Sequence, residues 1–122
     1  MNTTPDNLLR PDNIEVGRYV YEVLVTDTVI YRIVKQTAKS ITIRATRCAL
    51  DESGRQLTKG TYPYIRTAQV DDGEGREMTL RVRKDGTYRI SNYRGARSLR
   101  YAELETFEDG NEYPSEYVDY SF

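Results

Sequence analysis

The sequence predicts a small all-β protein built as a single antiparallel barrel. Residues 16–47 consist almost wholly of Val, Ile, Thr, Tyr and other residues that favour strands. Beyond them, Gly, Pro and Asp clusters divide the chain into short segments. A length of 122 residues suits one domain with one modest core. We therefore expect an SH3-like or OB-like barrel of five to six strands over residues 16–107. A polar N-terminal arm (1–15) would precede it, and an acidic C-terminal extension (108–122) would follow.

The first two strands are expected at residues 18–25 and 29–35, behind an arm anchored by Leu8 and Leu9. A three-residue loop between the strands would set Val23 against Tyr31 and Glu22 against Arg32, which pairs apolar with apolar and acid with base. A two-residue loop would oppose Tyr21 and Arg32, so we favour the longer one.

A third strand is expected at residues 40–48, where Ile41 and Ile43 alternate with polar residues. The glycine-broken excursion that follows holds one candidate strand at 61–70, which Pro63 would confine to a sheet edge. The acidic turn at 71–75 lacks the alternating ligands of a calcium loop, so it is interpreted as a solvated turn.

Residues 78–92 predict a hairpin that turns at residues 84–86, with Gly86 left-handed. This register pairs Val82 with Tyr88 and Leu80 with Ile90. It also builds a cationic ridge of Arg81, Arg83 and Arg89.

The last third of the chain is less clearly patterned. Residues 93–107 fit either a helical face or a short strand at 99–104, and we favour the strand. In the extension, Pro114 suits the start of one helical turn, which would place Tyr113, Tyr117 and Tyr120 on one side.

The composition excludes several kinds of chemistry. The chain has no His, which removes serine-histidine and cysteine-histidine catalysis and His-containing zinc sites. Its single cysteine, Cys48, is expected to be structural. No glycine pattern of a nucleotide-binding loop occurs. We therefore predict a non-enzyme with no catalytic residues, metal or cofactor. No apolar run approaches the roughly 20 residues that a membrane span needs, so the protein is expected to be soluble and cytoplasmic.

Charge is segregated along the chain although its net value is −1. Residues 76–100 hold eight Arg or Lys against Glu77 and Asp85, a net charge of +6. Arg can neutralise phosphates and Tyr can stack on unpaired bases. The alternatives are a solvated strand face and arginines that pair with the chain's own tail. The candidate nucleic-acid-binding residues are Arg81, Arg83, Lys84, Arg89, Tyr93, Arg94, Arg97 and Arg100.

Residues 103–122 hold seven acids and no base, a net charge of −7, together with several aromatic residues. Carboxylates spaced in this way can imitate the phosphates of nucleic acid, and Tyr is common at interface hot spots. The alternatives are docking on the chain's own barrel and free disorder. The candidate protein-binding residues are Glu105, Glu108, Asp109, Glu112, Tyr113, Glu116, Tyr117, Asp119, Tyr120 and Phe122.

The segment VIYRIVKQTAKSITIRATR (residues 29–47), followed by a basic strand pair, resembles small β-barrel proteins of actinobacterial phages and related mobile elements. That resemblance implies a phage-type accessory protein in the bacterial cytoplasm and carries over no catalytic residues. By analogy, small acidic phage proteins of the anti-CRISPR kind block host defence nucleases.

Two functions follow as expectations. The first is a non-catalytic inhibitor whose acidic, Tyr-rich surface binds a host protein, such as a nucleic-acid-guided nuclease. The alternative is a small nucleic-acid-binding barrel that uses the Arg-rich hairpin. The target and the oligomeric state stay open.

Overall fold

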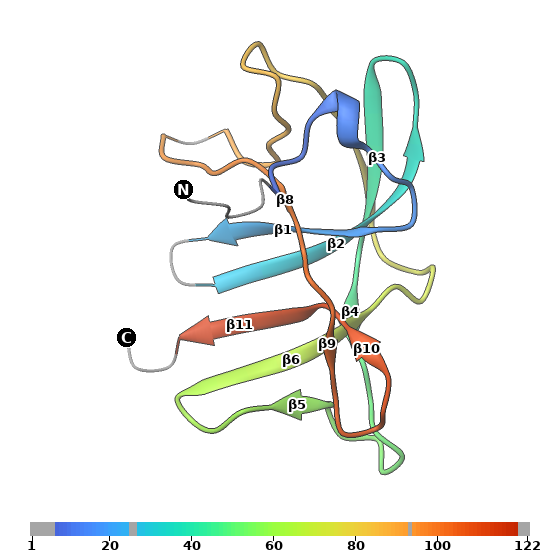
Figure 1. Cartoon of the computed structure of the whole chain (residues 1–122), viewed down its shortest axis with the longest axis vertical. Coiled ribbons are helices and arrows are strands. Elements are labelled where there is room, and N and C mark those ends of the chain that lie inside the picture. Colours follow the sequence, from blue (N-terminus) through green and yellow to red (C-terminus); the bar gives the residue numbers. More distant parts are fainter. Residues whose placement is uncertain (1–6, 25–26, 93, 120–122) are drawn as a thin grey trace, which may run out of the picture.

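The computed structural model describes residues 7–24, 27–92 and 94–119. It confirms an all-β chain with antiparallel pairing, in two sheets placed end to end (Figure 1). The upper sheet has the order β7-β3-β2-β1-β8; the lower has the order β11-β6-β4, with β5 also on β6 and a separate β9–β10 pair. The elements are η1 (Pro11–Asn13), β1 (Tyr19–Leu24), β2 (Asp27–Gln36), β3 (Ser40–Ala45), β4 (Arg47–Cys48), β5 (Thr58–Lys59), β6 (Tyr64–Val70), β7 (Glu77–Arg81), β8 (Arg100–Tyr101), β9 (Glu105–Thr106), β10 (Glu112–Tyr113) and β11 (Ser115–Asp119).

The first hairpin forms, but in a register that differs from the predicted one. Leu24 pairs with Asp27 and Val20 with Tyr31, so the predicted three-residue loop is wrong. Val20 and Tyr31 thereby enter the upper core, while Ile30, on the other face of β2, is also buried. Apolar side chains are buried on both faces of β2. Matching apolar residues across the hairpin therefore does not distinguish one register from another.

The predicted strand at 40–48 divides at Thr46 and serves both sheets. Ile41 and Ile43 are buried in β3, as predicted, and β4 leaves to pair with β6 in the lower sheet. Thr46 marks the crossing, where its hydroxyl donates to the carbonyl of Ile30 at 2.8 Å. Gly75 packs against this bend, and a Cβ there would lie 1.9 Å from the carbonyl oxygen of Ala45.

Strand pairing continues from the upper sheet into the lower one, but the predicted closed barrel does not form among the described residues. β2 pairs with β3, β4 continues beyond β3 to pair with β6, and β6 pairs with β11. No ladder joins β11 back to β2 in the part of the chain that is described. There the amide of Ile30 donates instead to the carboxylate of Glu116 at 3.3 Å.

Two strand predictions of the lower sheet need correction. Pro63 precedes β6, which is an interior strand between β11 and β4 and not an edge. Pro114 opens no helical turn, because the residues after it form β11 along β6. The segment predicted as an acidic extension is therefore part of the lower sheet.

The basic hairpin is only half formed. β7 pairs with β3, and the amide of Arg83 donates to the carbonyl of Thr87 at 2.8 Å. Gly86 has φ +81°, so its predicted left-handed conformation is confirmed. Residues 87–92 form no strand, and Tyr88 turns inward to the core, 3% exposed. The predicted pairing of Leu80 with Ile90 is therefore wrong.

Each sheet has its own core. Leu9 of the arm is fully buried in the upper one, as the anchoring prediction requires, beside Leu99. The lower core packs Leu57, Ala68 and Phe107 together.

Candidate nucleic-acid interface

Basic side chains from three separate segments meet at the upper end of the molecule. The register that pairs Ser40 with Arg81 places the β2–β3 turn beside the end of β7. Arg83 donates to the side-chain oxygen of Asn92 at 3.0 Å, and the hydroxyl of Ser98 donates to that of Thr87 at 3.0 Å. These bonds hold Asn92 and Ser98 against the turn that follows β7.

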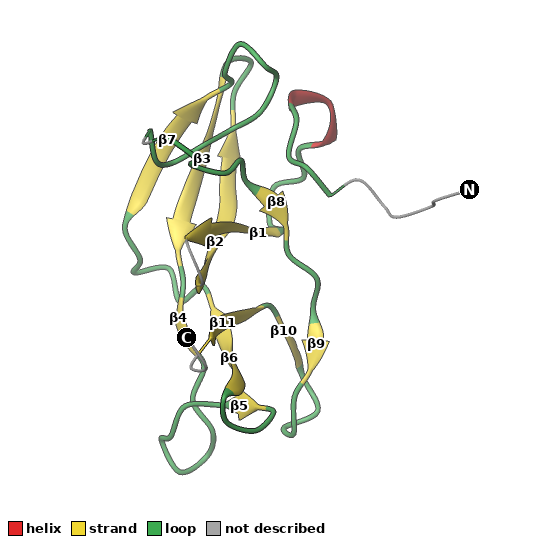
Figure 2. Cartoon of the chain, turned by 90° about the vertical axis from the view of Figure 1, so that its left-hand side faces the viewer, coloured by secondary structure: helices red, strands yellow, loops and turns green. Residues whose placement is uncertain are grey.

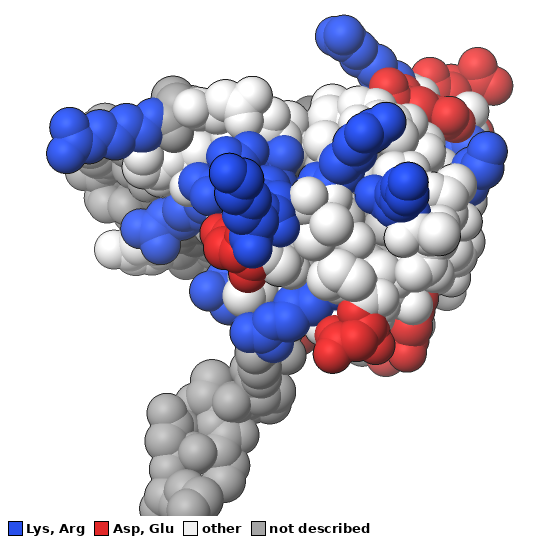
Figure 3. Space-filling view, turned by 90° about the horizontal axis from the view of Figure 1, so that it is seen from above, with Lys and Arg blue, Asp and Glu red and all other residues white. Residues whose placement is uncertain are grey.

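We call this surface the basic end. Its exposed cations are Lys35, Lys39, Arg81, Arg83, Lys84, Arg94 and Arg97. Figure 3 looks onto it and shows Lys and Arg spread across the face, with some Asp and Glu near its margins and one acidic group among the basic side chains. Arg83 bonds to Asn92 and is also attracted by the nearby carboxylate of Asp85. The other six cations have no side-chain hydrogen bond or ion pair among the described residues. The charges of these six are therefore available to an external anion.

Two of the predicted arginines have other partners. Arg89 lies 3.4 Å from the carboxylate of Asp85, so it does not complete the predicted ridge. Thr87 holds that carboxylate through its hydroxyl and amide, which lowers the pKa of Asp85. Arg100 donates to the side-chain oxygen of Asn7 at 2.8 Å.

Aromatic stacking is not offered at the basic end by the described tyrosines. Tyr88 is buried, and burial raises its pKa. Tyr101 is also buried, and its hydroxyl donates to the carbonyl of Asn13 at 2.5 Å. Tyr93 lies outside the described residues. The basic end is therefore a charged surface without a described stacking platform.

The sequence did not predict the contribution of Lys35 and Lys39. They lie about forty residues before the basic segment and join it only through the pairing of β3 with β7. The one signal in the sequence was the alternation of polar and apolar residues in Ser40–Ala45, which predicts a strand. Such a strand can pair with one neighbour on each side, but its sequence does not identify β7 as one of them.

The predicted acidic surface is divided among several local roles. Glu105 forms an ion pair with Arg66 and accepts from the hydroxyl of Ser115. Glu116 points to β2, and burial, together with the nearby Asp27, raises its pKa.

Three further acids of the predicted surface, Glu108, Asp109 and Glu112, lie in or next to the turn between β9 and β10. The hydroxyl of Tyr113 donates to Asp109 at 2.7 Å, and this bond lowers the pKa of Asp109. The Tyr113 ring packs edge-on against Phe107, with 5.7 Å between ring centroids. Glu108 and Glu112 are exposed. Tyr117 and Asp119 occupy β11, and Tyr120 and Phe122 lie outside the described residues.

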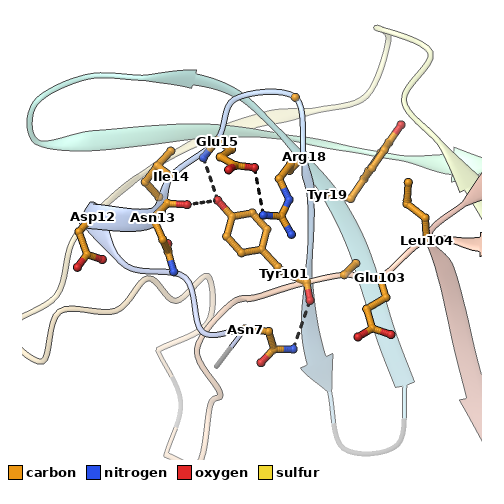
Figure 4. A pocket seen from close by; sticks show the side chains of 12 residues that line it. Asn7, Asp12, Asn13, Ile14, Glu15, Arg18, Tyr19, Tyr101, Glu103 and Leu104 are labelled. Atoms are coloured by element: carbon orange, nitrogen blue, oxygen red, sulfur yellow. Dashed lines mark hydrogen bonds and ion pairs between the residues drawn. The ribbon is translucent and has the colours of Figure 1, made fainter. Parts of the chain in front are cut away.

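A hollow beside β1 and β8 was not predicted (Figure 4). The guanidinium of Arg18 stacks 3.8 Å over the ring of Tyr101 and pairs with Glu15 at 3.1 Å. The amide of Glu15 donates to the Tyr101 hydroxyl at 2.9 Å. The polar groups of Glu15, Arg18 and Tyr101 thus bond to one another. These contacts attach the N-terminal arm to β8.

Residues 7–24, 27–92 and 94–119 contain no group of three or more Cys, Asp or Glu placed to hold a metal ion. No helix in the same ranges is long and apolar enough to cross a bilayer. Cys48 is a half-buried free thiol that accepts from the side-chain amide of Gln69 at 3.7 Å.

Comparison of the chain with protein-family models, with curated proteins and with solved structures finds no significant match.

Proposed function

We propose that this chain is a non-catalytic binding protein that places its basic end against the phosphate backbone of a nucleic acid. The observation that carries the proposal is the convergence of seven exposed cations from three segments on one end. Such cations bind phosphates by releasing condensed counterions. Since no described tyrosine offers a stacking surface there, the binding is expected to depend on charge and little on base sequence.

The described acids after residue 102 form no ion pair with the basic end. Glu105 instead pairs with Arg66 of the lower sheet. The full chain is therefore expected to bind without removal of its C-terminal strands.

The test is fluorescence anisotropy with labelled single- and double-stranded DNA and RNA across a salt series. Affinity should fall steeply with salt, with a slope of about −0.9 in log K against log salt for each duplex phosphate neutralised. Arg97→Ala should weaken binding at low salt and reduce the size of the slope by about one. Arg55→Ala, which removes an exposed cation of the lower end, is the matched control.

Absence of binding by the full chain at low salt would refute the proposal. Equal losses in Arg97→Ala and Arg55→Ala would also refute it, because they would show attraction by overall charge and not by the basic end.

A second candidate is the anti-CRISPR-type inhibitor of a host defence nuclease. The observation that favours it is an acidic groove at the lower end, where Asp51 and Glu52 meet Glu108 and Asp109 beside the exposed Leu50. Acidic carboxylates around an apolar residue suit the basic cleft of a nuclease. Inhibition of cleavage by a purified guided nuclease, lost on Glu108→Lys and kept on Arg97→Ala, would support this candidate over the first.

A further inference from the structure

The edge of the upper sheet at β7 is open. β7 is the outermost strand of that sheet, and Figure 2 shows it at the margin. It has five residues paired with β3 in one unbroken register, and it contains no proline or bulge. Natural sheets usually protect such an edge with one of these devices, since its free backbone groups can pair with another strand.

The register identifies the free backbone groups. The amide of Ala45 donates to the carbonyl of Arg76 at 2.9 Å, so residues 76, 78 and 80 direct their backbone groups toward β3. The alternation of an antiparallel ladder then turns the N–H and C=O groups of Glu77, Thr79 and Arg81 outward. These outward groups have no partner among the described residues.

We propose that this edge pairs with the β7 edge of a second copy of the chain, antiparallel and about a two-fold axis at Thr79. In this register Thr79 faces its own equivalent, and Glu77 faces Arg81 of the second copy. All three outward-directed residues of each strand then form hydrogen-bonded pairs. The two upper sheets become one continuous sheet.

The side chains of β7 are complementary in the same register. Opposite charges meet on the outer face, where Arg44 contacts only the Oε2 atom of Glu77 and leaves Oε1 without a described partner. On the inner face Met78 meets Leu80 of the second copy, and both already pack against the upper core. An isologous interface requires this self-complementarity.

The segments that flank β7 extend the charge match. Before the strand lie the exposed acid Glu74 and the exposed base Arg76, and after it lie the exposed bases Arg83 and Lys84. Residues 74–77 therefore carry two acids and one base, a net charge of −1, and residues 81–84 carry three bases, a net charge of +3. Antiparallel pairing brings the acidic end of one strand beside the basic end of the other. A peptide from an unrelated protein would need to supply this charge order, whereas a second copy already has it.

The first test compares sedimentation of the full chain with Thr79→Pro and Thr79→Ala over a concentration series. Proline removes only the outward N–H of Thr79, so pairing with β3 is kept. Both variants lose the Thr79 hydroxyl contact with Thr42, which makes alanine the matched control. The wild type and Thr79→Ala should shift from monomer to dimer with concentration, and Thr79→Pro should stay monomeric while keeping its circular dichroism spectrum. A wild type that is monomeric throughout, or a Thr79→Pro variant that still dimerises, would overturn the proposal.

The second test fixes the register by oxidation in a Cys48→Ser background. Residues 79 of the two copies would have Cα atoms about 5.5 Å apart, which a disulfide can span. Thr79→Cys should therefore form a covalent dimer, and Arg81→Cys, which faces position 77, should not. Equal cross-linking of both variants would exclude this register even if the chain dimerises. Both tests are made without nucleic acid, so their failure leaves the proposed function unaffected.

Discussion

Asp71, in the turn that follows β6, is held by two arginines and a backbone amide. Its Oδ2 atom lies 3.1 Å from Arg44 and 3.5 Å from Arg32, and its Oδ1 atom accepts the amide of Gly73. The side chain is only 3% exposed. Burial acts to raise its pKa, but the Gly73 and Arg44 bonds prevail and lower it. The acidic turn at 71–75 thus has a structural role, because Asp71 ties it to β2 and β3.

We expect Asp71→Asn to lower the free energy of unfolding at pH 7 by about 2 kcal/mol, since charge-assisted bonds to two arginines are lost. Because the folded pKa is depressed, the contribution is present above the unfolded-state pKa of about 3.9 and is lost as pH falls through the lower, folded value. Urea unfolding at pH 7 and in strong acid measures both effects. Asp72→Asn, which removes a partner of the more exposed Arg47, should change stability little. Equal losses in the two variants would contradict this expectation.

At the scale of elements, the contact between β11 and β2 lies where β3 ends. Beyond Ala45 the pairing of β2 is continued only by Thr46, whose amide and hydroxyl both donate to the carbonyl of Ile30, at 3.4 and 2.8 Å. The amide of Ile30 donates to the side-chain carboxylate of Glu116 in β11 at 3.3 Å. A side chain thus supplies the acceptor that a backbone carbonyl would supply in a ladder between β11 and β2.

Glu116→Gln is expected to be at least as stable as the wild type at pH 7, because glutamine keeps an acceptor for Ile30 without a buried charge. The raised pKa means that the folded chain binds the proton more tightly than the unfolded chain. Wild-type stability from this group therefore falls as pH rises from about 4.3 through the folded value. The advantage of Glu116→Gln should vanish below that window in thermal unfolding across pH.

Two controls accompany this prediction. Glu112→Gln, on the exposed part of β10, should show no such pH dependence. Glu116→Ala should lose about 1 kcal/mol, because it leaves the Ile30 amide without an acceptor. A glutamine variant as unstable as the alanine variant would show that the charge itself is needed.

At the scale of the whole molecule, the opposite charges of the sequence fall on different sheets. The basic segment completes the upper sheet, and the acidic segment supplies β9, β10 and β11 below it. Phe107 of the acidic segment is buried in the lower core, 3% exposed. The acidic strands therefore have a packing role that does not depend on any partner.

Truncation after Ala102 should consequently unfold the lower sheet and not merely uncover the basic end. It removes β11 from β6 and exposes Leu57 and Ala68. The loss should exceed the roughly 3–5 kcal/mol that replacing one buried Phe by Ala costs. Urea unfolding and binding of a hydrophobic dye measure it, with Phe107→Ala as the smaller comparison. A truncated chain with unchanged unfolding and no dye binding would contradict the expectation.

Local periodicity was sufficient for much of the fold. Alternation placed Ile41 and Ile43 in the core, and the left-handed Gly86 was identified from the turn chemistry. Local signals failed where a distant strand decided the outcome. Pro114 favoured a helical turn until β6 supplied a strand partner, and the register of β2 could not be fixed by alternation because both of its faces are buried.

The candidate site was predicted in part for the same reason. The basic segment was evident as a run of charges, but Lys39 reaches it only through the pairing of β3 with β7. Asp71 was interpreted as solvated, because its partners Arg32 and Arg44 lie 39 and 27 residues away along the chain. These separations are much longer than the segment of a single strand or turn, so local patterns do not connect the carboxylate with its arginines.

The order of β6 and β11 along the chain has a consequence for biosynthesis. β6 is complete long before β11 leaves the ribosome, so during translation one side of β6 has no strand beside it. The upper sheet can assemble as soon as β8 emerges, whereas the lower sheet must wait for β11. A nascent chain stalled between β8 and β11 would therefore expose one side of β6 to any strand in its surroundings.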